Sequence, residues 1–147
     1  SKNLIEYLRY SLPGFVFSVG ISPPLAAASL EALHQLQTNP KIMENLRTNI
    51  RVFSEEAAKR NLDICLAGET AILPVLVGGD DDSFRLSVEL SKRGVFVPPA
   101  VYPAVPRGKS RLRYCVTSEH TPEQIIRALD ILVDTAKDMG INLPAPK

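Results

Sequence analysis

The sequence predicts an α+β fold in which helices cover one face of a small sheet of three strands. Several segments place apolar residues three or four positions apart between helix start and stop signals, whereas three others alternate or carry closely spaced prolines. The elements follow one another as helices, a strand, a helix, two strands and a final helix. This order favours one layer of helices packed on one sheet.

The N-terminal segment is expected to begin with one short helix. Leu4 to Arg9 has helical spacing, and Pro13-Gly14 ends that pattern. The apolar segment from Gly14 to Ser22 is either extended or the buried approach to the next helix. A second helix is expected from Pro23, because a proline at the first helical position loses no hydrogen bond and strong helix formers follow it.

The clearest amphipathic helix is expected after Asn39. Asn39 is a good N-cap residue, and Pro40 suits the first helical position. The residues behind Pro40 place apolar side chains at spacings of three and four, which defines one buried face. That face is formed by Ile42, Leu46, Ile50, Phe53 and Ala57.

A strand and a helix are expected in the middle of the chain. Ile72 to Gly78 has the pattern of a buried strand, and Pro74 inside it indicates a sheet edge or a bulge. Ser83 to Leu90 alternates as a strand would, but Asp80 to Asp82 precede it and Lys92-Arg93-Gly94 follow it. Acidic residues favour a helix start and a basic pair with glycine favours its end, so a helix is the expectation here.

The C-terminal part is expected to add two strands and a helix. The segment VFVPPAVYPAVP is extended, because each proline removes a donor and disfavours helix before it. Thr121 and Gln124 form a capping-box pattern that starts the last helix, and Gly140 is a natural stop. Strands are therefore expected near Leu73–Val77, Gly94–Val101 and Leu112–Thr117. In the last strand Leu112, Tyr114 and Val116 share one face, and Arg111, Arg113 and Cys115 share the other.

Composition and charge exclude several classes of protein. The chain has 17 lysines and arginines against 16 aspartates and glutamates, without a basic stretch interleaved with aromatic residues, so no nucleic-acid partner is expected. No apolar run approaches the roughly 20 residues of a membrane-spanning helix, and the first residues lack the pattern of a signal peptide. We therefore expect a cytoplasmic protein.

Few residues carry a pattern typical of catalysis or metal binding. Glu55-Glu56 and Asp80 to Asp82 are adjacent carboxylates, but their positions favour a surface helix and a helix N-terminus. Cys65 and Cys115 lie far apart and outside any CxxC motif, so both are expected to be reduced residues of the core, and no metal is expected. His120 precedes a helix cap and is expected to be structural.

Arg113 is the strand residue whose chemistry suggests binding. Its guanidinium points off the strand opposite the apolar face, and a planar guanidinium pairs well with a carboxylate or a phosphate. A surface ion pair accounts for this position equally well. Lys2 lies at the chain terminus and is expected to be solvated rather than to act as a Schiff-base lysine.

Five segments resemble, in order and spacing, the C-terminal portion of the α-oxoamine synthases, a branch of the fold type I pyridoxal-phosphate enzymes. They are SKNLIEYLRYSLPGFVFS, SPPLAAASLEAL, LPVLVGG, GVFVPPAVYPAVPRGKSRLR and HTPEQIIRAL, which together span nearly the whole chain. The resemblance implies the C-terminal small domain of that fold type. Such a domain has a small, mainly antiparallel sheet of three strands with helices on one face, plus N-terminal helices.

The resemblance also implies a function. Members of the family condense an amino acid with an acyl thioester to give an α-amino ketone, and pyridoxal phosphate serves as the electron sink. Residues 1–147 would be a single C-terminal domain, with residues 1–39 connecting it to a missing N-terminal cofactor-binding domain. The Schiff-base lysine belongs to that other domain, so this chain alone is expected to be inactive and not to bind the cofactor. The parent enzyme would be a homodimer.

Two residues match functional positions of the family. Arg113, the second arginine of SRLR, matches the arginine that grips the amino-acid carboxylate. Ser18 matches a region that reaches the cofactor phosphate of the neighbouring subunit. The chain departs from the family next to Ser18, because Val19 and Gly20 stand where a Thr or Asn and then a small hydroxyl residue are usual. That departure weakens the match at the phosphate contact.

The resemblance does not separate the subfamilies. VYPAVPRG followed by SRLR and HTPEQI is similar to glycine C-acetyltransferase, whereas RYCVTSEHT also resembles serine palmitoyltransferase. Val101 stands where biotin-pathway members carry an arginine, so that subfamily is less favoured. The acyl carrier, coenzyme A or a carrier protein, stays open. An aminotransferase-like relative is one alternative, and a non-catalytic subunit or docking module, motivated by Val19 and Gly20, is another.

Overall fold

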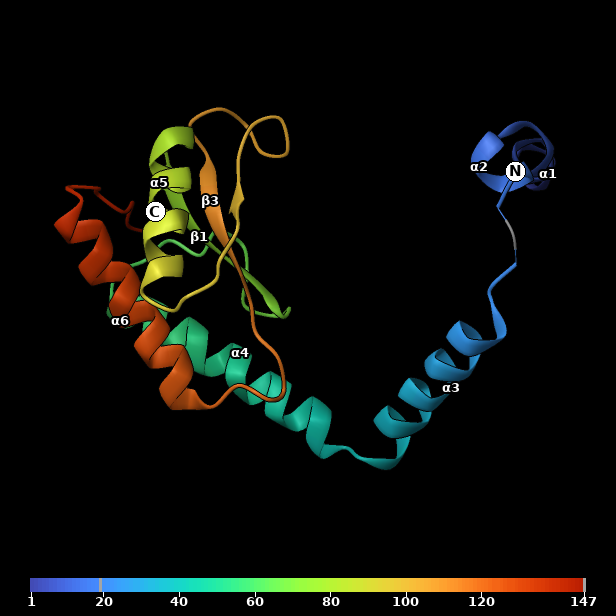
Figure 1. Ribbon diagram of the computed structural model, residues 1–147, viewed down its shortest axis with the longest axis horizontal. Coiled ribbons are helices and arrows are strands. Elements are labelled where there is room, and N and C mark those ends of the chain that lie inside the picture. Colours follow the sequence, from blue (N-terminus) through green and yellow to red (C-terminus); the bar gives the residue numbers. More distant parts are fainter. Residues whose placement is uncertain (19, 147) are drawn as a thin grey trace. The chain divides into compact units, whose positions relative to one another are not determined.

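Six helices and three strands lie within residues 1–18 and 20–146, the part of the chain that the computed structural model describes (Figure 1). The chain divides into two units, Ser1–Asn39 and Pro40–Lys147. The strands all belong to the second unit. This content of helices and strands confirms the α+β class.

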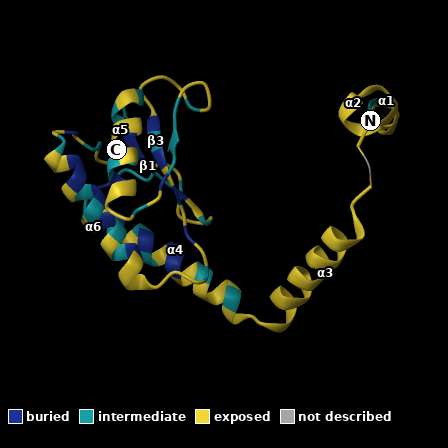
Figure 2. Ribbon diagram, viewed as in Figure 1, coloured by how far each residue is buried: buried dark blue, intermediate teal, exposed yellow. Residues whose placement is uncertain are grey.

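The secondary structure elements described in the unit Ser1–Asn39 are all helices. Ser1 caps the first of them through its Oγ, which accepts a hydrogen bond from the Leu4 N–H. The segment expected to be extended or buried begins instead with a short helix, because Leu12 is extended before Pro13 and Pro13 suits the first helical position. None of the described residues of this unit is buried (Figure 2). Its helices are α1 (Lys2–Ser11), α2 (Pro13–Val16) and α3 (Pro23–Thr38).

The helices of the unit Pro40–Lys147 are α4 (Lys41–Lys59), α5 (Asp80–Lys92) and α6 (Pro122–Asp138). The expectation that Asn39 caps α4 is wrong by one residue. Pro40 is the N-cap of α4, whereas Asn39 closes α3 by donating its backbone N–H to the Gln35 carbonyl at 2.9 Å. The helix expected around Ser83–Leu90 is confirmed by α5, whose first turn carries the three aspartates.

The ends of α6 follow the sequence signals. Thr121 Oγ1 accepts from the Gln124 N–H at 3.3 Å, and Gln124 Oε1 accepts from the Thr121 N–H at 2.9 Å. These two bonds form the expected capping box. At the other end Gly140 takes a φ of 67°, and the Ile141 N–H donates to the Ala136 carbonyl at 2.8 Å. A glycine there ends the helix without steric cost.

The sheet is antiparallel, with the strand order β1-β3-β2. Its strands are β1 (Ile72–Gly78), β2 (Pro99–Ala100) and β3 (Ser110–Cys115). β1 is an edge strand, as Pro74 indicated. β2 is much shorter than the expected Gly94–Val101, because Pro98 and Pro99 supply no N–H groups to a ladder and the chain turns after Ala100.

Helices cover one face of the sheet. α5 contacts β1, β2 and β3, and α6 packs against α4 and α5. Phe53 of α4 packs on Tyr114 of β3, with ring centroids 5.3 Å apart, so α4 closes the same side. The expected packing of Leu86 and Leu129 is confirmed, because both side chains are fully buried. The core also contains Ile50, Phe53, Ala57, Leu73, Val75, Leu90, Val97, Leu112 and Leu132.

No helix among the described residues is long and apolar enough to cross a membrane.

Candidate functional site

β3 places Arg113 on the uncovered face of the sheet. Leu112 and Tyr114 are 0% and 7% exposed on the helix-covered face, whereas Arg113 between them is exposed. Successive side chains of a strand point to opposite faces, so the alternation predicted for this strand is confirmed. Because α4, α5 and α6 all lie on the other side, Arg113 projects away from the core.

The Arg113 guanidinium has no ion pair with any residue that the structure describes. A surface ion pair was the alternative explanation for an arginine at this position. The described residues provide none, and a guanidinium stays charged at every physiological pH. Its five donors are therefore available to an anion from outside this part of the chain.

Arg111 shares this face but has partners of its own. Its Nε donates to the Lys109 carbonyl at 3.1 Å, and its Nη1 lies 3.6 Å from the sulfur of Cys65. These contacts orient the Arg111 side chain toward the loop before β3. The two arginines of the SRLR segment thus differ in their side-chain contacts. Arg111 has partners, whereas the Arg113 side chain has none among the described residues.

Ser18 lies in the other unit, just after α2. Its hydroxyl donates to the Phe15 carbonyl at 2.9 Å, and the side chain is exposed. The neighbouring departure from the family pattern falls on Val19, which lies outside the described residues, and on Gly20, which is exposed and has no heavy atom near the position of a Cβ. Ser18 belongs to the unit Ser1–Asn39, whereas Arg113 belongs to the unit Pro40–Lys147.

The prediction that both cysteines belong to the core is wrong. Cys65 and Cys115 are free thiols, as expected, but both are exposed. Cys115 has the same strand parity as Arg113, which puts it on the uncovered face. Cys65 lies in the loop after α4 with a φ of 60°, and its N–H donates to Asp63 Oδ1 at 2.7 Å.

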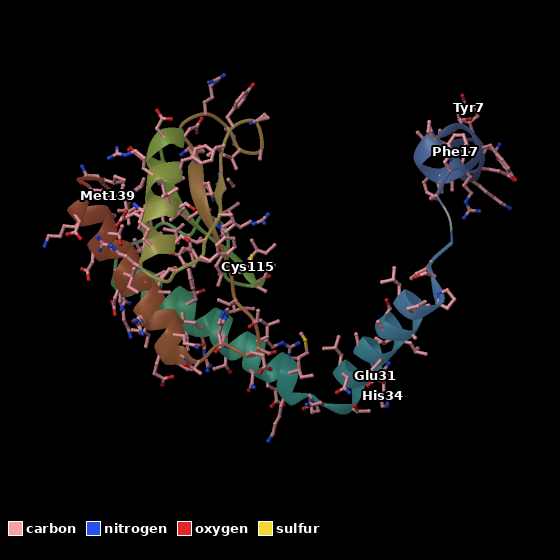
Figure 3. The ribbon with its side chains drawn as sticks, viewed as in Figure 1. Tyr7, Phe17, Glu31, His34, Cys115 and Met139 are labelled. Atoms are coloured by element: carbon pink, nitrogen blue, oxygen red, sulfur yellow. The ribbon has the colours of Figure 1, made fainter. Side chains whose placement is uncertain are left out.

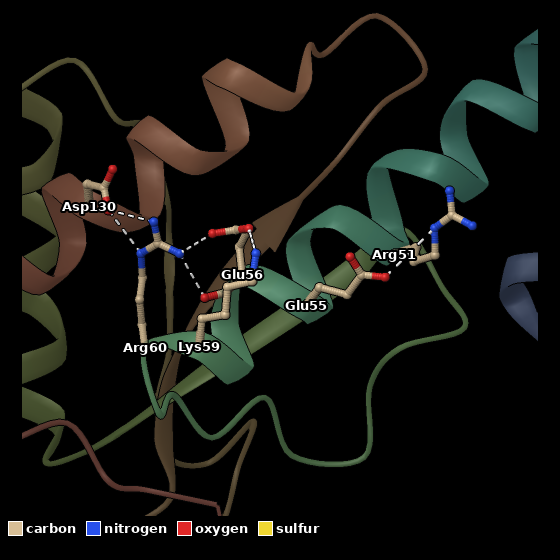
Figure 4. A network of polar contacts seen from close by, with 6 residues as sticks. All are labelled: Arg51, Glu55, Glu56, Lys59, Arg60 and Asp130. Atoms are coloured by element: carbon tan, nitrogen blue, oxygen red, sulfur yellow. Dashed lines mark hydrogen bonds and ion pairs between the residues drawn. The ribbon is translucent and has the colours of Figure 1, made fainter.

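The adjacent carboxylates have structural partners. Glu56 accepts hydrogen bonds from Arg60 at 2.6 Å and from Lys59 at 2.5 Å, and Arg60 also pairs with Asp130 of α6 at 2.6 Å (Figure 4). Hydrogen bonding to Arg60 and then to Lys59 lowers the pKa of Glu56. In the first turn of α5, Asp80 accepts a hydrogen bond from the buried Ser110 hydroxyl. Both groups therefore connect secondary structure elements.

His120 makes hydrogen bonds within its turn and to α4. Its Nδ1 accepts from the Thr117 N–H at 3.0 Å. Its carbonyl accepts from Asn49 Nδ2 at 2.6 Å, and Asn49 also donates to the Thr117 carbonyl at 2.9 Å. Asn49 is 3% exposed, so this buried amide fixes the turn between β3 and α6 to α4. Among the described residues no group of three or more potential metal ligands gathers.

The described residues do not fit pyridoxal phosphate on their own. Such a site needs a lysine for the aldehyde and a set of free donors for the phosphate. Lys2 lies on α1, none of whose residues is buried, and the Ser18 hydroxyl already donates to a carbonyl. Arg113 instead has the chemistry of a carboxylate-binding group.

Comparison with known proteins relates the chain to one family. The pattern of the family described as aminotransferase class I and II matches residues 1–132. The 8-amino-7-oxononanoate synthase 1 of Bacillus subtilis strain 168 is 39% identical over 141 residues, which are 96% of this chain and 36% of the relative. The 2-amino-3-ketobutyrate coenzyme A ligase of Escherichia coli K12 is 31% identical over 140 residues, which are 95% of this chain and 35% of the relative.

Solved structures have the same fold. Serine palmitoyltransferase of Sphingomonas wittichii matches with a TM-score of 0.78 at 23% identity, over 94% of this chain and 35% of that chain. An 8-amino-7-oxononanoate synthase from Francisella tularensis matches with a TM-score of 0.73 at 22% identity, over 96% of this chain and 41% of that chain. These matches confirm the predicted fold.

The chain spans about a third of the length of the curated relatives it matches. Of these two relatives, the 8-amino-7-oxononanoate synthase is the more identical to this chain. Residues 1–132 match the family pattern, so the chain belongs to the aminotransferase class I and II family, and its relatives are α-oxoamine synthases, as the sequence resemblance indicated.

Proposed function

We propose that this chain is the C-terminal, substrate-side domain of a pyridoxal-phosphate-dependent α-oxoamine synthase. The parent enzyme would condense an amino acid with an acyl thioester to give an α-amino ketone. The observation that carries this proposal is Arg113, a guanidinium without an ion pair among the described residues, on the uncovered face of the sheet. The match to 8-amino-7-oxononanoate synthases over nearly the whole chain supports the reaction class.

Arg113 would hold the carboxylate of the amino-acid substrate. A guanidinium presents two parallel N–H groups in one plane, and a carboxylate accepts both at once. This contact fixes the orientation of the amino acid as well as its position. Arg113 therefore orients the substrate, and its proposed role is binding rather than bond making or breaking.

The groups that hold the cofactor would lie in a further, N-terminal part of the parent. Residues 1–39 would connect that part to the sheet-containing unit. Support comes from exposed apolar side chains on α1 to α3, since large apolar surfaces are usually covered by another domain or subunit. Tyr7 and Phe17, labelled in Figure 3, are 66% and 82% exposed.

We further propose that the parent is a homodimer of the cytoplasm, as the family resemblance implies, and that Ser18 contacts the cofactor phosphate of the neighbouring subunit.

The second candidate function is that of an aminotransferase, because the matching family pattern includes that class. An aminotransferase also needs an arginine for the substrate carboxylate, so Arg113 fits both reactions. The two reactions differ in their products. A condensation releases the free thiol of the acyl carrier, whereas an amino transfer releases a 2-oxo acid and consumes a second 2-oxo acid.

The test is product analysis on the full-length parent protein. The protein is loaded with pyridoxal phosphate and incubated with an amino acid and a coenzyme A thioester, and in a parallel reaction with the amino acid and a second 2-oxo acid that can accept its amino group. Thiol release is followed with a chromogenic disulfide. We expect thiol release that requires both substrates, together with an amino ketone detected by mass spectrometry. Formation of a 2-oxo acid without thiol release would instead establish the aminotransferase.

A further inference from the structure

Two buried polar side chains hold the two ends of β3, the strand that carries Arg113. At the first residue of β3, the buried Ser110 hydroxyl donates to Asp80 in the first turn of α5. Beyond the last residue of β3 the chain reaches α4 before it enters α6 (Figure 1), and there Asn49 Nδ2 donates to the Thr117 carbonyl at 2.9 Å. β3 is therefore connected to two different helices, at positions on either side of Arg113.

The other buried polar side chains among the described residues make local bonds. The hydroxyls of Ser83 and Thr135 each donate to the carbonyl four residues earlier, at 2.7 and 2.6 Å. Such bonds connect one turn of a helix with the turn before it. Asn49 and Ser110 differ from them, because their bonds connect β3 and the turn after it with α4 and α5.

The ladder of the sheet is irregular or short where these bonds occur. The register between β1 and β3 shifts at a bulge beside Ser110, so the pairing is interrupted at that end. On the other edge, β2 supports β3 through two residues, Pro99 and Ala100. A strand that slips by one residue turns every side chain to the opposite face, which would exchange Arg113 for Leu112. Bonds from the helices can fix the register where the ladder does not.

The two bonds select a geometry more than they add stability. A buried hydrogen bond between neutral groups contributes little net free energy, because the unfolded chain bonds to water instead. A displacement of β3, however, would leave the Ser110 hydroxyl and the Asn49 amide buried without partners, which costs much more than the bonds contribute. Satisfied buried polar groups of this kind favour one arrangement of the elements that they join.

We propose that Asn49 and Ser110 are positioning residues that hold Arg113 in place for the amino-acid substrate. They act from the helix-covered side, whereas Arg113 lies on the uncovered face, so neither would touch the substrate. A displacement of about 1 Å at a group that orients a substrate can cost about a hundredfold in rate. This inference rests on the proposed function, in which Arg113 binds the substrate carboxylate.

Hydrogen exchange of the Arg113 amide measures the effect on β3 directly in the 147-residue chain. This amide donates to the Pro98 carbonyl, so it exchanges when that part of the sheet opens. Asn49→Asp keeps the side-chain shape but replaces the donating amide with an acceptor, and Ser110→Ala removes the hydroxyl. We expect the Arg113 amide to exchange about tenfold faster in each variant, while the amides in the middle of α6 keep their rates.

Ser83→Ala is the matched control. Ser83 and Ser110 are both serines with no exposed surface, but the Ser83 hydroxyl bonds at the start of its own helix rather than to β3. The control should therefore leave exchange of the Arg113 amide unchanged. Faster exchange throughout the chain in Asn49→Asp would reflect global destabilisation by a buried charge, in which case Ser110→Ala decides the test.

Steady-state kinetics of the full-length parent enzyme separate positioning from stability. A variant that only loses folded protein lowers the apparent kcat and leaves both KM values unchanged. We expect instead that Asn49→Asp and Ser110→Ala each raise the KM for the amino acid about tenfold and leave the KM for the acyl donor unchanged. Ser83→Ala should change neither KM value.

The inference is overturned if Arg113→Ala raises the KM for the amino acid but neither Asn49→Asp nor Ser110→Ala does. It is also overturned if the Arg113 amide exchanges in both variants as it does in the unmodified chain. An effect of one variant alone overturns the role of the other residue. If Arg113→Ala itself leaves the KM for the amino acid unchanged, the proposed carboxylate contact is wrong, and this inference falls with it.

Discussion

Pro74 of β1 lies directly opposite Arg113 of β3 in the antiparallel register. Proline has no N–H to donate, and the Arg113 N–H donates to the Pro98 carbonyl at 2.9 Å on the other side of β3. The main chain of Arg113 is therefore held by the β2 side of the sheet. Leu112 and Tyr114 on either side are buried against the helices. The Arg113 side chain must therefore point to the opposite face of the sheet.

Changing Arg113 to alanine or lysine should weaken amino-acid use in the parent enzyme. Loss of a charge-assisted pair in a desolvated site costs about 2 to 4 kcal/mol, which corresponds to a fall of roughly thirty- to a thousand-fold in kcat/KM for the amino acid. Lysine should not restore activity, because its ammonium lacks the planar fork. Steady-state kinetics with each substrate varied in turn, together with cofactor absorbance, measure the effect. The KM of the acyl donor and cofactor binding should stay unchanged.

Arg111→Ala is the matched control for Arg113. Arg111 shares the uncovered face but already donates to the Lys109 carbonyl. Its loss should therefore change amino-acid use much less. If Arg111→Ala abolishes amino-acid saturation and Arg113→Ala does not, the carboxylate role belongs to Arg111.

Leu112→Ala should destabilise the chain by about 2–5 kcal/mol, because it empties a fully buried position beneath α5. Arg113→Ala, on the next residue of the same strand, should change the free energy of unfolding by no more than about 0.5 kcal/mol, since its side chain is exposed. Urea unfolding followed by circular dichroism compares the two. Equal destabilisation would contradict the assignment of the two faces of β3.

Local patterns predicted the parts of this fold that depend on neighbouring residues. The alternation of β3 and the capping box of α6 both follow from residues within one element. The prediction for the cysteines is wrong because a free cysteine is usually buried, whereas Cys115 has the strand parity of Arg113 and Cys65 lies in a loop. The expected strand Gly94–Val101 is longer than β2, because an extended proline-rich segment need not form the hydrogen bonds of a sheet.

Other features depend on contacts between distant parts of the chain and were not predictable from local patterns. The pair of Arg60 with Asp130 joins residues 70 positions apart, and Asn49 reaches His120 across 71 positions. The burial of the Tyr114 hydroxyl without a partner among the described residues depends on the packing around β3. The role of Arg113 was suggested by family resemblance, and its lack of an ion pair among the described residues came from the structure.

Glu56→Gln should remove part of the acid sensitivity of the fold. Hydrogen bonds from Arg60 and Lys59 hold the pKa of Glu56 below its ordinary value. A carboxyl whose pKa is lower in the folded state stabilises that state fully above its unfolded pKa, and the contribution is lost as the pH falls through the folded pKa. The melting temperature of the parent sequence should therefore fall more steeply below about pH 4.5 than that of the variant. Thermal unfolding between pH 7 and about pH 3 measures both slopes.

Glu55→Gln is the control for this pH effect. Glu55 lies next to Glu56, and its substitution removes the same charge. Its ion pair with Arg51, however, spans 3.9 Å between exposed side chains. Such pairs contribute little to stability. Equal flattening of the pH profile by both variants would assign the effect to net charge rather than to the contacts of Glu56.

The 147-residue chain should not take up pyridoxal phosphate stoichiometrically. Lys2 is exposed on α1, and the described residues do not form a phosphate site around it. Absorbance titration with pyridoxal phosphate should show only weak, unsaturated attachment to surface lysines. Saturable attachment of one equivalent to a single lysine, trapped with borohydride and mapped by peptide mass spectrometry, would refute this prediction.

Removing residues 1–39 should leave the unfolding of the remaining domain unchanged. Every member of the core cluster lies between Ile50 and Ile141, and no described residue of Ser1–Asn39 is buried. The shortened chain should melt at the same temperature as the full one and bind less of a hydrophobic dye, because the exposed apolar side chains of α1 to α3 are gone. A chain that begins at Arg60 is the contrasting control, since it also loses Ile50, Phe53 and Ala57 from the core. Loss of three buried apolar side chains exceeds what a marginally stable domain tolerates, so this second truncation should show no cooperative transition. If instead both truncations melt alike, α4 is not part of the folding unit and the boundary at Pro40 is misplaced.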